Sequence, residues 1–315
     1  MSMVTKPLIV ITGPTATGKT ALAAALALAR DGEVISADSM QIYRGMNVGT
    51  AKPTAAEMRG VPHHMIDVAD PEENWSVARW ADMAAAAAED ILARGKLPIA
   101  AGGTGQYIDA LVSGTDFATA GDAAVRAALG AEYDALGGEA FRARLASVDP
   151  QRAEKLSPAD KKRLVRAMEV YTLTGETITE HDLRTRQLPP RFASLRFALT
   201  YNDRETLYRR IRDRVDRMEA DGLFDEVEAL LRRGIPPEST AMQAIGYKEV
   251  AAALRGECSR KEALEAVKTA SCRYAKRQLT WLRRDAGLRW LPREEYPDEA
   301  SALEQISLCL RQEAT

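Results

Sequence analysis

The sequence predicts an α/β protein in which helices cover both faces of a parallel β-sheet and a helical insertion domain interrupts the chain. Three observations predict this fold. Apolar, strand-like segments alternate with helix-forming segments over residues 1–114, a pattern typical of parallel sheets. Over residues 115–190 such segments give way to charged helical stretches. A strand-like segment returns at Ser194–Thr200, so residues 191–315 are expected to complete the core that residues 1–114 begin.

The elements of the first core segment follow from their local patterns. Three apolar runs predict strands: Leu8–Thr12, Glu33–Ala37 and Lys96–Ala101. Segments rich in alanine and leucine predict helices over Ala21–Arg30 and Val77–Arg94, and Gly95 ends the second one. Polar or glycine-rich residues follow all three strands. Because ligands bind at the carboxyl ends of the strands in such sheets, we expect the functional site at this edge.

The remainder of the chain is predicted to be mostly helical. The insertion contains two charged helical segments, Asp122–Leu129 and Pro158–Thr174. After the strand at Ser194–Thr200, the pattern predicts two long helices over Arg204–Arg233 and Arg260–Arg284.

Composition excludes several classes of protein. With 46% hydrophobic and 28% charged residues among 315, the chain lies in the globular range. Its three cysteines are far apart and form no C-x-x-C pair, which favours a reducing cytoplasm. No run of 18 apolar residues predicts a membrane span, so we expect a soluble, cytoplasmic monomer. The formal charge of −2 means that any nucleic-acid site must be a local basic patch.

The first strand leads into a phosphate-binding loop. Gly13-Pro-Thr-Ala-Thr-Gly-Lys-Thr20 has the P-loop spacing, with a strand predicted before it and a helix after it. Backbone N–H groups and the helix N-terminus attract an anion, Lys19 adds a positive charge, and Thr20 offers a hydroxyl to Mg²⁺. We therefore predict Mg²⁺ as cofactor, with Thr20 as its ligand, and a phosphate site made of Gly13, Pro14, Thr15, Ala16, Thr17, Gly18, Lys19 and Thr20.

The other two strand ends carry candidate catalytic groups. Asp38, with Ser39, Met40 and Gln41, follows the second strand and could act as a general base or a magnesium ligand. A helix cap or an Asx turn is the structural alternative for Asp38. Thr104 follows Gly102 and Gly103 at the third strand, where many phosphate-loop hydrolases carry an acidic residue; a tight turn is the alternative there.

Two further patterns bear on ligand binding. His63 and His64 adjoin each other, and neighbouring side chains on a strand point to opposite faces, so we favour a structural or substrate-contacting role over metal binding. Residues 260–284 carry eight basic and two acidic residues, with Tyr274 and Trp281 among them, which favours RNA binding by phosphate contact and base stacking. A merely solvated helix face is the alternative, both there and for the basic run Lys161–Arg163 with Arg166.

Taken together, these motifs resemble the tRNA dimethylallyltransferase (tRNA isopentenyltransferase) family, in its bacterial type without a C-terminal zinc finger. Besides the phosphate loop, the matching segments are Asp38–Tyr43, Gly102–Tyr107, Asp160–Val170, Gly222–Val227, Ala244–Glu249 and Tyr274–Trp281. They span nearly the whole chain in family order, and Gln106 stands where the family more often has leucine.

The resemblance implies transfer of a dimethylallyl group from dimethylallyl diphosphate to N6 of the adenosine on the 3′ side of the anticodon, in tRNAs that read uridine-led codons. Diphosphate is the product released, and the loop at residues 13–20 would hold it. The implied catalytic residues are Asp38 as base, with Lys19, Thr104 and Arg214 at the diphosphate. An ATP-dependent small-molecule kinase and an RNA-binding module with a vestigial pocket are the alternatives.

The resemblance also implies which residues hold the anticodon stem-loop. Those after the second strand would read the target adenine, and both the insertion and the last long helix would grip the RNA. The implied tRNA-binding residues are Asp38, Ser39, Met40, Gln41, Arg126, Lys162, Arg163, Leu164, Val165, Arg166, Lys276, Arg277, Gln278, Trp281 and Arg284.

Overall fold

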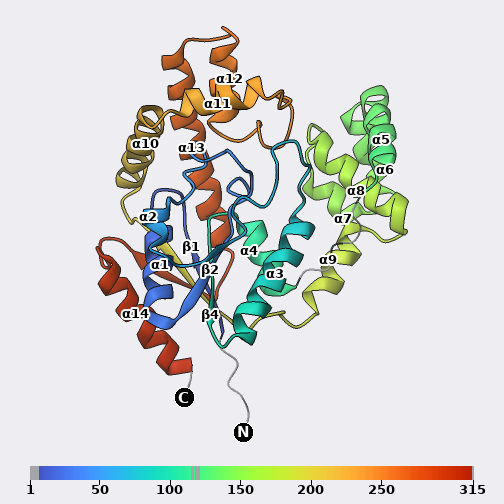
Figure 1. The fold of residues 1–315 in the computed structure, drawn as a ribbon. Coiled ribbons are helices and arrows are strands. Elements are labelled where there is room, and N and C mark those ends of the chain that lie inside the picture. Colours follow the sequence, from blue (N-terminus) through green and yellow to red (C-terminus); the bar gives the residue numbers. More distant parts are fainter. Residues whose placement is uncertain (1–6, 115–116, 118–120, 314–315) are drawn as a thin grey trace. The chain divides into compact units, whose positions relative to one another are not determined.

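The computed structural model describes residues 7–114, 117 and 121–313, and its β-sheet is parallel throughout (Figure 1). Within the described residues, the strands follow the spatial order β3-β2-β4-β1-β5-β6. Their bounds are β1 Leu8–Thr12, β2 Gly32–Ser36, β3 His63–His64, β4 Leu97–Ala101, β5 Ser194–Thr200 and β6 Leu288–Pro292. The strands predicted at Leu8–Thr12 and Ser194–Thr200 form at those bounds, and the other two form within one residue.

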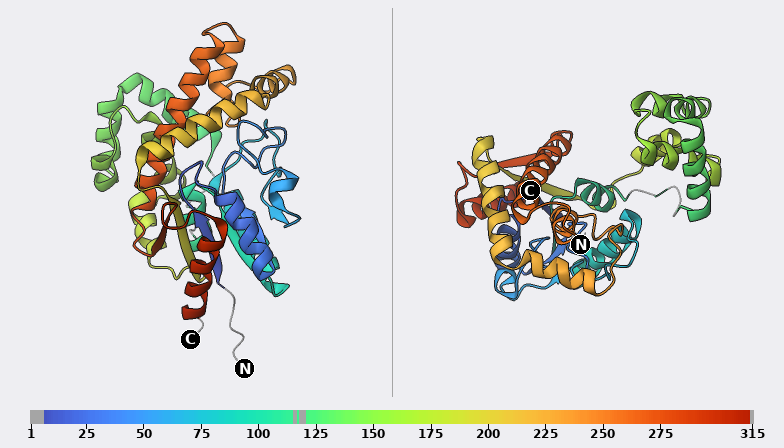
Figure 2. Two further views of the ribbon diagram at one scale, coloured as in Figure 1. Left: turned by 90° about the vertical axis from the view of Figure 1, so that its left-hand side faces the viewer. Right: turned by 90° about the horizontal axis from the view of Figure 1, so that it is seen from above.

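Both faces of the sheet are covered, as predicted. Side chains alternate along each strand, so Ile9, Ile11 and Phe197 face one side, where they pack with α1 (Lys19–Arg30) and α14 (Glu299–Glu313) in one apolar cluster. These two helices lie side by side in Figures 1 and 2. On the other face, Trp80 of α3 (Val77–Ala93) stacks on Tyr107 of α4 (Gly105–Ser113).

After β5, β6 is the one strand in the described C-terminal part of the core, and the other regular elements there are helices. These helices include α10 Arg204–Ala220, α11 Leu223–Arg232, α12 Tyr247–Leu254 and α13 Arg260–Leu282, and the short α2 (Ala55–Met58) lies earlier in the chain. The single helix predicted over Arg204–Arg233 is therefore wrong. It breaks after Asp221, where Gly222 takes a φ of +94° that other residues seldom adopt, and a second amphipathic helix starts.

The chain divides into two units. Residues 1–112 and 192–315 form the first, and residues 113–191 form the second, against the boundaries of 114 and 191 expected from the sequence. The second unit contains α5 Ala123–Leu136, α6 Gly138–Ala146, α7 Pro150–Lys155, α8 Lys161–Thr174 and α9 Ile178–Arg186. It has its own core, built around Phe141, Leu145 and Leu164.

Candidate functional site

The phosphate loop lies between β1 and the N-terminus of α1. Gly18 precedes the helix in a left-handed conformation and provides no side-chain cap, so the first N–H groups of α1 are available to an anion. The Lys19 ammonium donates to the Pro14 carbonyl across the loop at 2.8 Å, and the Thr17 hydroxyl donates to the same carbonyl at 2.9 Å. These two hydrogen bonds fix the conformation of the loop and the position of Lys19 within it.

Two arginines of α10 reach the same loop. Arg214 donates to the Thr15 hydroxyl at 3.1 Å, and Arg210 donates to the Ala16 carbonyl at 3.2 Å. These contacts bring together residues about 200 positions apart, and they place Arg214 beside the loop as the family resemblance implies.

The charge of Lys19 depends on this environment. Burial lowers the pKa of Lys19 to about 7, the Arg214 charge acts in the same direction, and the Asp38 carboxylate opposes both. The lysine is therefore a cation that titrates near neutral pH, and a bound anion would favour its protonated form.

Asp38 follows β2, and one of its oxygens closes a turn. Its Oδ1 accepts the Met40 N–H at 2.9 Å and the Gln41 N–H at 3.4 Å. The Asx turn considered from the sequence is therefore present. Burial raises the pKa of the Tyr274 hydroxyl and the Asp38 carboxylate acts in the same direction, while the same carboxylate opposes the lowering of the Lys19 pKa. A structural role for one oxygen leaves the second available for chemistry.

The glycine-rich loop after β4 packs against the end of β2. The Thr104 N–H donates to the Ala37 carbonyl at 3.2 Å, and the Thr104 hydroxyl accepts the Ser39 N–H at 3.2 Å. Thr104 is thus bonded to the residues on either side of Asp38, as expected for the ends of neighbouring parallel strands.

Gln278 connects this edge of the sheet to α13. Its Oε1 accepts the Thr15 N–H at 3.1 Å, and its Nε2 donates to the Gly103 carbonyl at 2.8 Å. The residue is 7% exposed and lines the cavity that contains Asp38, so it lies apart from the exposed basic residues of α13. It ties the phosphate loop to the loop after β4.

Two cavities of the first unit meet at the phosphate loop. One, of about 780 Å³, is lined by cationic residues including Lys52, Arg210 and Arg217. The other, of about 330 Å³, is lined by residues including Asp38 and Tyr274. The residues common to both linings are Lys19, Thr20, Arg214 and Met218.

The predicted basic helix is present as α13. Lys276, Arg277 and Arg284 are exposed, and Arg284 lies over the Trp281 ring at 5.3 Å. The Trp281 indole N–H donates to Asp109 at 3.0 Å, and the side chain is 37% exposed. Trp281 is therefore oriented by the protein with part of its surface open.

In the second unit, the predicted RNA-binding residues differ in their exposure and in their partners. Lys162 and Arg163 are exposed on α8, whereas Arg126 and Arg166 pair with the buried Glu169. The side chains of Leu164 and Val165 are 0% and 5% exposed and pack in the core. The prediction that these two contact tRNA is wrong for their side chains, because an amphipathic helix buries them while it exposes its basic face.

The two histidines have protein partners. His64 Nε2 lies 2.8 Å from Glu33, and His63 Nδ1 lies 2.9 Å from the Val61 carbonyl. Over the described ranges 7–114, 117 and 121–313, the structure contains no cluster of three His, Cys, Asp or Glu side chains that could hold a metal ion. Nor does a helix in those ranges have the length and apolar character needed to cross a bilayer.

Sequence reasoning missed the contacts that hold the loop over residues 46–52. Lys52 is buried and donates to the Tyr43 carbonyl and to Asp67, and Glu226 accepts backbone N–H groups of this loop. The Gly222–Val227 segment was recognised only as a family match, with no role given to Glu226.

A phosphate loop ringed by a lysine and arginines, with a carboxylate and hydroxyls facing it from the neighbouring strand ends, defines an α/β enzyme that acts on a phosphorylated substrate. The comparisons identify its family. A family model described as IPP transferase matches residues 41–285, and one described as Isopentenyl transferase matches residues 6–70. The chain belongs to the IPP transferase family, the tRNA isopentenyltransferases.

Relatives and solved structures agree with this assignment. The chain is 47% identical to a tRNA dimethylallyltransferase of Desulforudis audaxviator, over 98% of each chain. It is similar to the crystal structure of a tRNA isopentenylpyrophosphate transferase from Bacillus halodurans, with 39% identity, a TM-score of 0.73 and 98% of each chain covered. A eukaryotic dimethylallyltransferase described as acting on tRNA matches with 31% identity and a TM-score of 0.75, over 88% of this chain and 70% of that one. The predicted α/β fold and family are thus confirmed.

Proposed function

We propose that the protein transfers the dimethylallyl group of dimethylallyl diphosphate to N6 of the adenosine on the 3′ side of the anticodon, in tRNAs that read uridine-led codons. The observation that carries this proposal is the pair of cavities that share Lys19, Thr20, Arg214 and Met218. One is rich in cations and suits a diphosphate. The other contains Asp38 and suits a base that must lose a proton.

The reaction needs one bond to break and one to form. The bond from C1 of the dimethylallyl group to the diphosphate oxygen breaks, a bond from N6 to C1 forms, and Asp38 accepts the proton that N6 loses. Lys19 and Arg214 stabilise the charge that develops on the leaving diphosphate, and the Thr104 hydroxyl is a further donor to it. Met218 provides apolar surface where the two cavities meet.

The donor set fits Mg²⁺ as cofactor. Thr20 offers a hydroxyl at the phosphate loop and lines both cavities, and Mg²⁺ is commonly held by few protein oxygens together with phosphates and water. Bound there, the ion would add positive charge beside the leaving diphosphate. Thr20 and the diphosphate oxygens are the ligands that we propose.

The adenosine must be unpaired, because its amine reaches a cavity of this kind only when the base leaves the stack. The proposal is tested with labelled dimethylallyl diphosphate and three acceptors: an anticodon stem-loop, the same stem-loop with its target adenosine paired in a duplex, and AMP. We expect transfer to the first and poor transfer to the other two. Comparable transfer to AMP would contradict a tRNA substrate.

A kinase is disfavoured by both chemistry and comparison. The loop after β4 supplies Thr104 between glycines and no carboxylate, and the relatives are named dimethylallyltransferases. Incubation with ATP and nucleosides should therefore give no phosphorylated nucleoside.

We further propose that the enzyme acts as a monomer in the cytoplasm.

We propose that α13 binds the phosphate backbone of the stem-loop. Replacing Arg277 and Arg284 together by alanine is expected to weaken RNA binding. The slope of log affinity against log salt concentration should become shallower by roughly 0.7–0.9 per lost phosphate contact. Affinity for dimethylallyl diphosphate should not change. Binding is measured against salt concentration by fluorescence anisotropy.

The matched control removes the same charge elsewhere. Arg30 and Arg311 are exposed in the last turns of α1 and α14, and their double alanine variant should keep the wild-type salt slope. An unchanged slope in the Arg277 and Arg284 variant would contradict RNA binding by α13 and would indicate that its basic residues only form a solvated helix face.

A further inference from the structure

Two sequence segments with no role in the chemistry above meet in the structure. Glu226 belongs to the Gly222–Val227 segment and lies on α11, and Tyr247 belongs to the Ala244–Glu249 segment and begins α12. The Tyr247 hydroxyl donates to Glu226 Oε1 at 2.6 Å. The two segments therefore form one local structure, although 20 residues separate these side chains.

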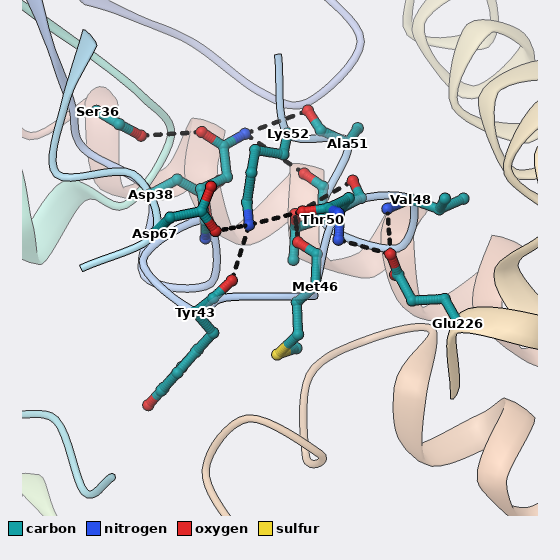
Figure 3. A network of polar contacts seen from close by, with 12 residues as sticks. Ser36, Asp38, Tyr43, Met46, Val48, Thr50, Ala51, Lys52, Asp67 and Glu226 are labelled. Atoms are coloured by element: carbon teal, nitrogen blue, oxygen red, sulfur yellow. Dashed lines mark hydrogen bonds and ion pairs between the residues drawn. The ribbon is translucent and has the colours of Figure 1, made fainter. Parts of the chain in front are cut away.

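The Glu226 carboxylate binds the backbone of a loop from the other end of the chain. Its Oε2 accepts the N–H groups of Asn47 at 2.7 Å and Val48 at 2.8 Å, and its Oε1 accepts that of Gly49 at 3.0 Å. Figure 3 shows Glu226 reaching this loop. Three successive N–H groups form a site for an anion, and here the protein's own carboxylate occupies it.

Tyr247 also limits the space around this loop. A Cβ at Gly49 would lie 2.5 Å from the Tyr247 ring, closer than real contacts allow. The loop backbone therefore packs directly on the ring while the ring hydroxyl binds the carboxylate that holds the loop. Together the two side chains fix the loop by position and by charge.

The opposite end of the loop holds a residue of the proposed adenine site. The Gln41 amide donates to the Ala51 carbonyl at 3.2 Å and the Thr50 carbonyl at 3.4 Å, and it accepts the Ser36 hydroxyl at 2.9 Å. The Gln41 N–H also donates to Asp38. A displacement of the loop would therefore be transmitted to the turn that contains the proposed base.

The same loop borders both cavities. Asn47, Val48 and Ala51 line the cationic cavity, and Gly49 and Thr50 line the cavity that contains Asp38. The loop is thus a common wall between the places that we assign to the two substrates.

We propose that Glu226 is a positioning residue for the transfer, acting with Tyr247: it fixes the loop over residues 46–52 so that the two substrates meet in reactive geometry. This inference rests on the proposed function. Glu226 touches neither substrate, so its loss should impair the reaction of bound substrates more than the binding of either one. A displacement of about 1 Å can cost on the order of 10²-fold in rate.

The test is Glu226→Gln, which keeps the size of the side chain but turns one acceptor into a donor facing backbone N–H groups. We expect the single-turnover rate constant to fall by roughly 10-fold to 100-fold, with full binding stoichiometry and dissociation constants for dimethylallyl diphosphate and the stem-loop within about twofold of wild type. Tyr247→Phe removes one of the four donors and should cause a smaller loss. The double variant should lose less than the product of the two single losses, since both act through one contact.

The matched control is Glu228→Gln. Glu228 lies on the same helix and pairs with Arg232 on the surface at 2.6 Å, so this change removes an equal charge without touching the loop, and the rate should stay at the wild-type value. A wild-type rate in Glu226→Gln would overturn the proposal. So would a loss of diphosphate binding in proportion to rate in both Glu226→Gln and Tyr247→Phe, which would place the loop within the diphosphate site.

Hydrogen exchange separates this inference from the proposed function. The amides of residues 47–49 should exchange faster in Glu226→Gln than in wild type or Glu228→Gln, whichever substrate the enzyme uses. Unchanged exchange would overturn the positioning role even if transfer to tRNA is demonstrated. Faster exchange in Glu226→Gln, together with a wild-type enzyme that fails to modify the stem-loop, would instead overturn the proposed substrate alone.

Discussion

Asp38→Asn is expected to slow single-turnover transfer by roughly 10²-fold to 10⁴-fold, the range typical of losing a general base. The structure makes this substitution unusually clean. Asp38 uses Oδ1 to accept the N–H groups of Met40 and Gln41, and an asparagine can accept both bonds with its own Oδ1. The turn should therefore survive, and the loss should be that of the proton acceptor.

The assay conditions for this variant follow from its neighbours. The Asp38 charge raises the pKa of Lys19 against the effects of burial and Arg214, so its removal should lower that pKa further. Affinity for the diphosphate substrate is therefore measured near pH 6, below the wild-type Lys19 pKa of about 7, and should change little there. An unchanged single-turnover rate at this pH would contradict the role of Asp38 as proton acceptor and would indicate that it only stabilises the turn.

Lys19→Ala is expected to reduce turnover by on the order of 10²-fold or more, because it removes a preorganised cation from the site where charge develops on the leaving group. Folding should survive, since the Thr17 hydroxyl also bonds the Pro14 carbonyl that Lys19 contacts. Turnover near the wild-type rate in the folded variant would contradict the phosphate-loop assignment.

The same variant should change the pH dependence of binding. With a pKa of about 7, Lys19 loses its proton as the pH rises above 7. Binding of the diphosphate then requires that Lys19 take up a proton again. Wild-type affinity should therefore fall by up to about tenfold per pH unit above 7. In Lys19→Ala this contribution disappears, while the ligand's own ionisation stays the same in both proteins. Calorimetric titration at pH 6.5, 7.5 and 8.5 compares the two slopes, and parallel slopes would contradict the assigned titration.

Local patterns predicted the parts of the fold that depend on nearby residues. The strand at Leu8–Thr12, the phosphate loop and the helix after it follow from a short stretch of sequence, and all are present. The strand β6 was not predicted because Leu288–Pro292 contains an arginine and ends in a proline. It is a strand because it pairs with β5 at the sheet edge, and that pairing has no local signal.

The candidate site shows the same division. Asp38 and Thr104 could be predicted because strand ends meet at one edge of a parallel sheet. The places of Gln278 and Glu226 could not, because each binds loops that are more than 170 residues away in sequence. A family match shows that such segments are present, but it does not predict which backbone groups their side chains bind.

The sheet order has a consequence for how the chain is made. Strand β1 pairs with β4 on one side and with β5 on the other, and the whole helical unit of residues 113–191 is synthesised between those two strands. During synthesis, one edge of β1 therefore stays unpaired until β5 emerges, more than 180 residues later. The apolar face that α14 covers stays exposed until the end of the chain emerges. The inserted unit, with its own core, can fold in that interval, as domains generally do during synthesis. We expect nascent chains to be most prone to misassociation and most dependent on chaperones between the emergence of β4 and that of β5, since an open strand edge is a template for wrong pairing.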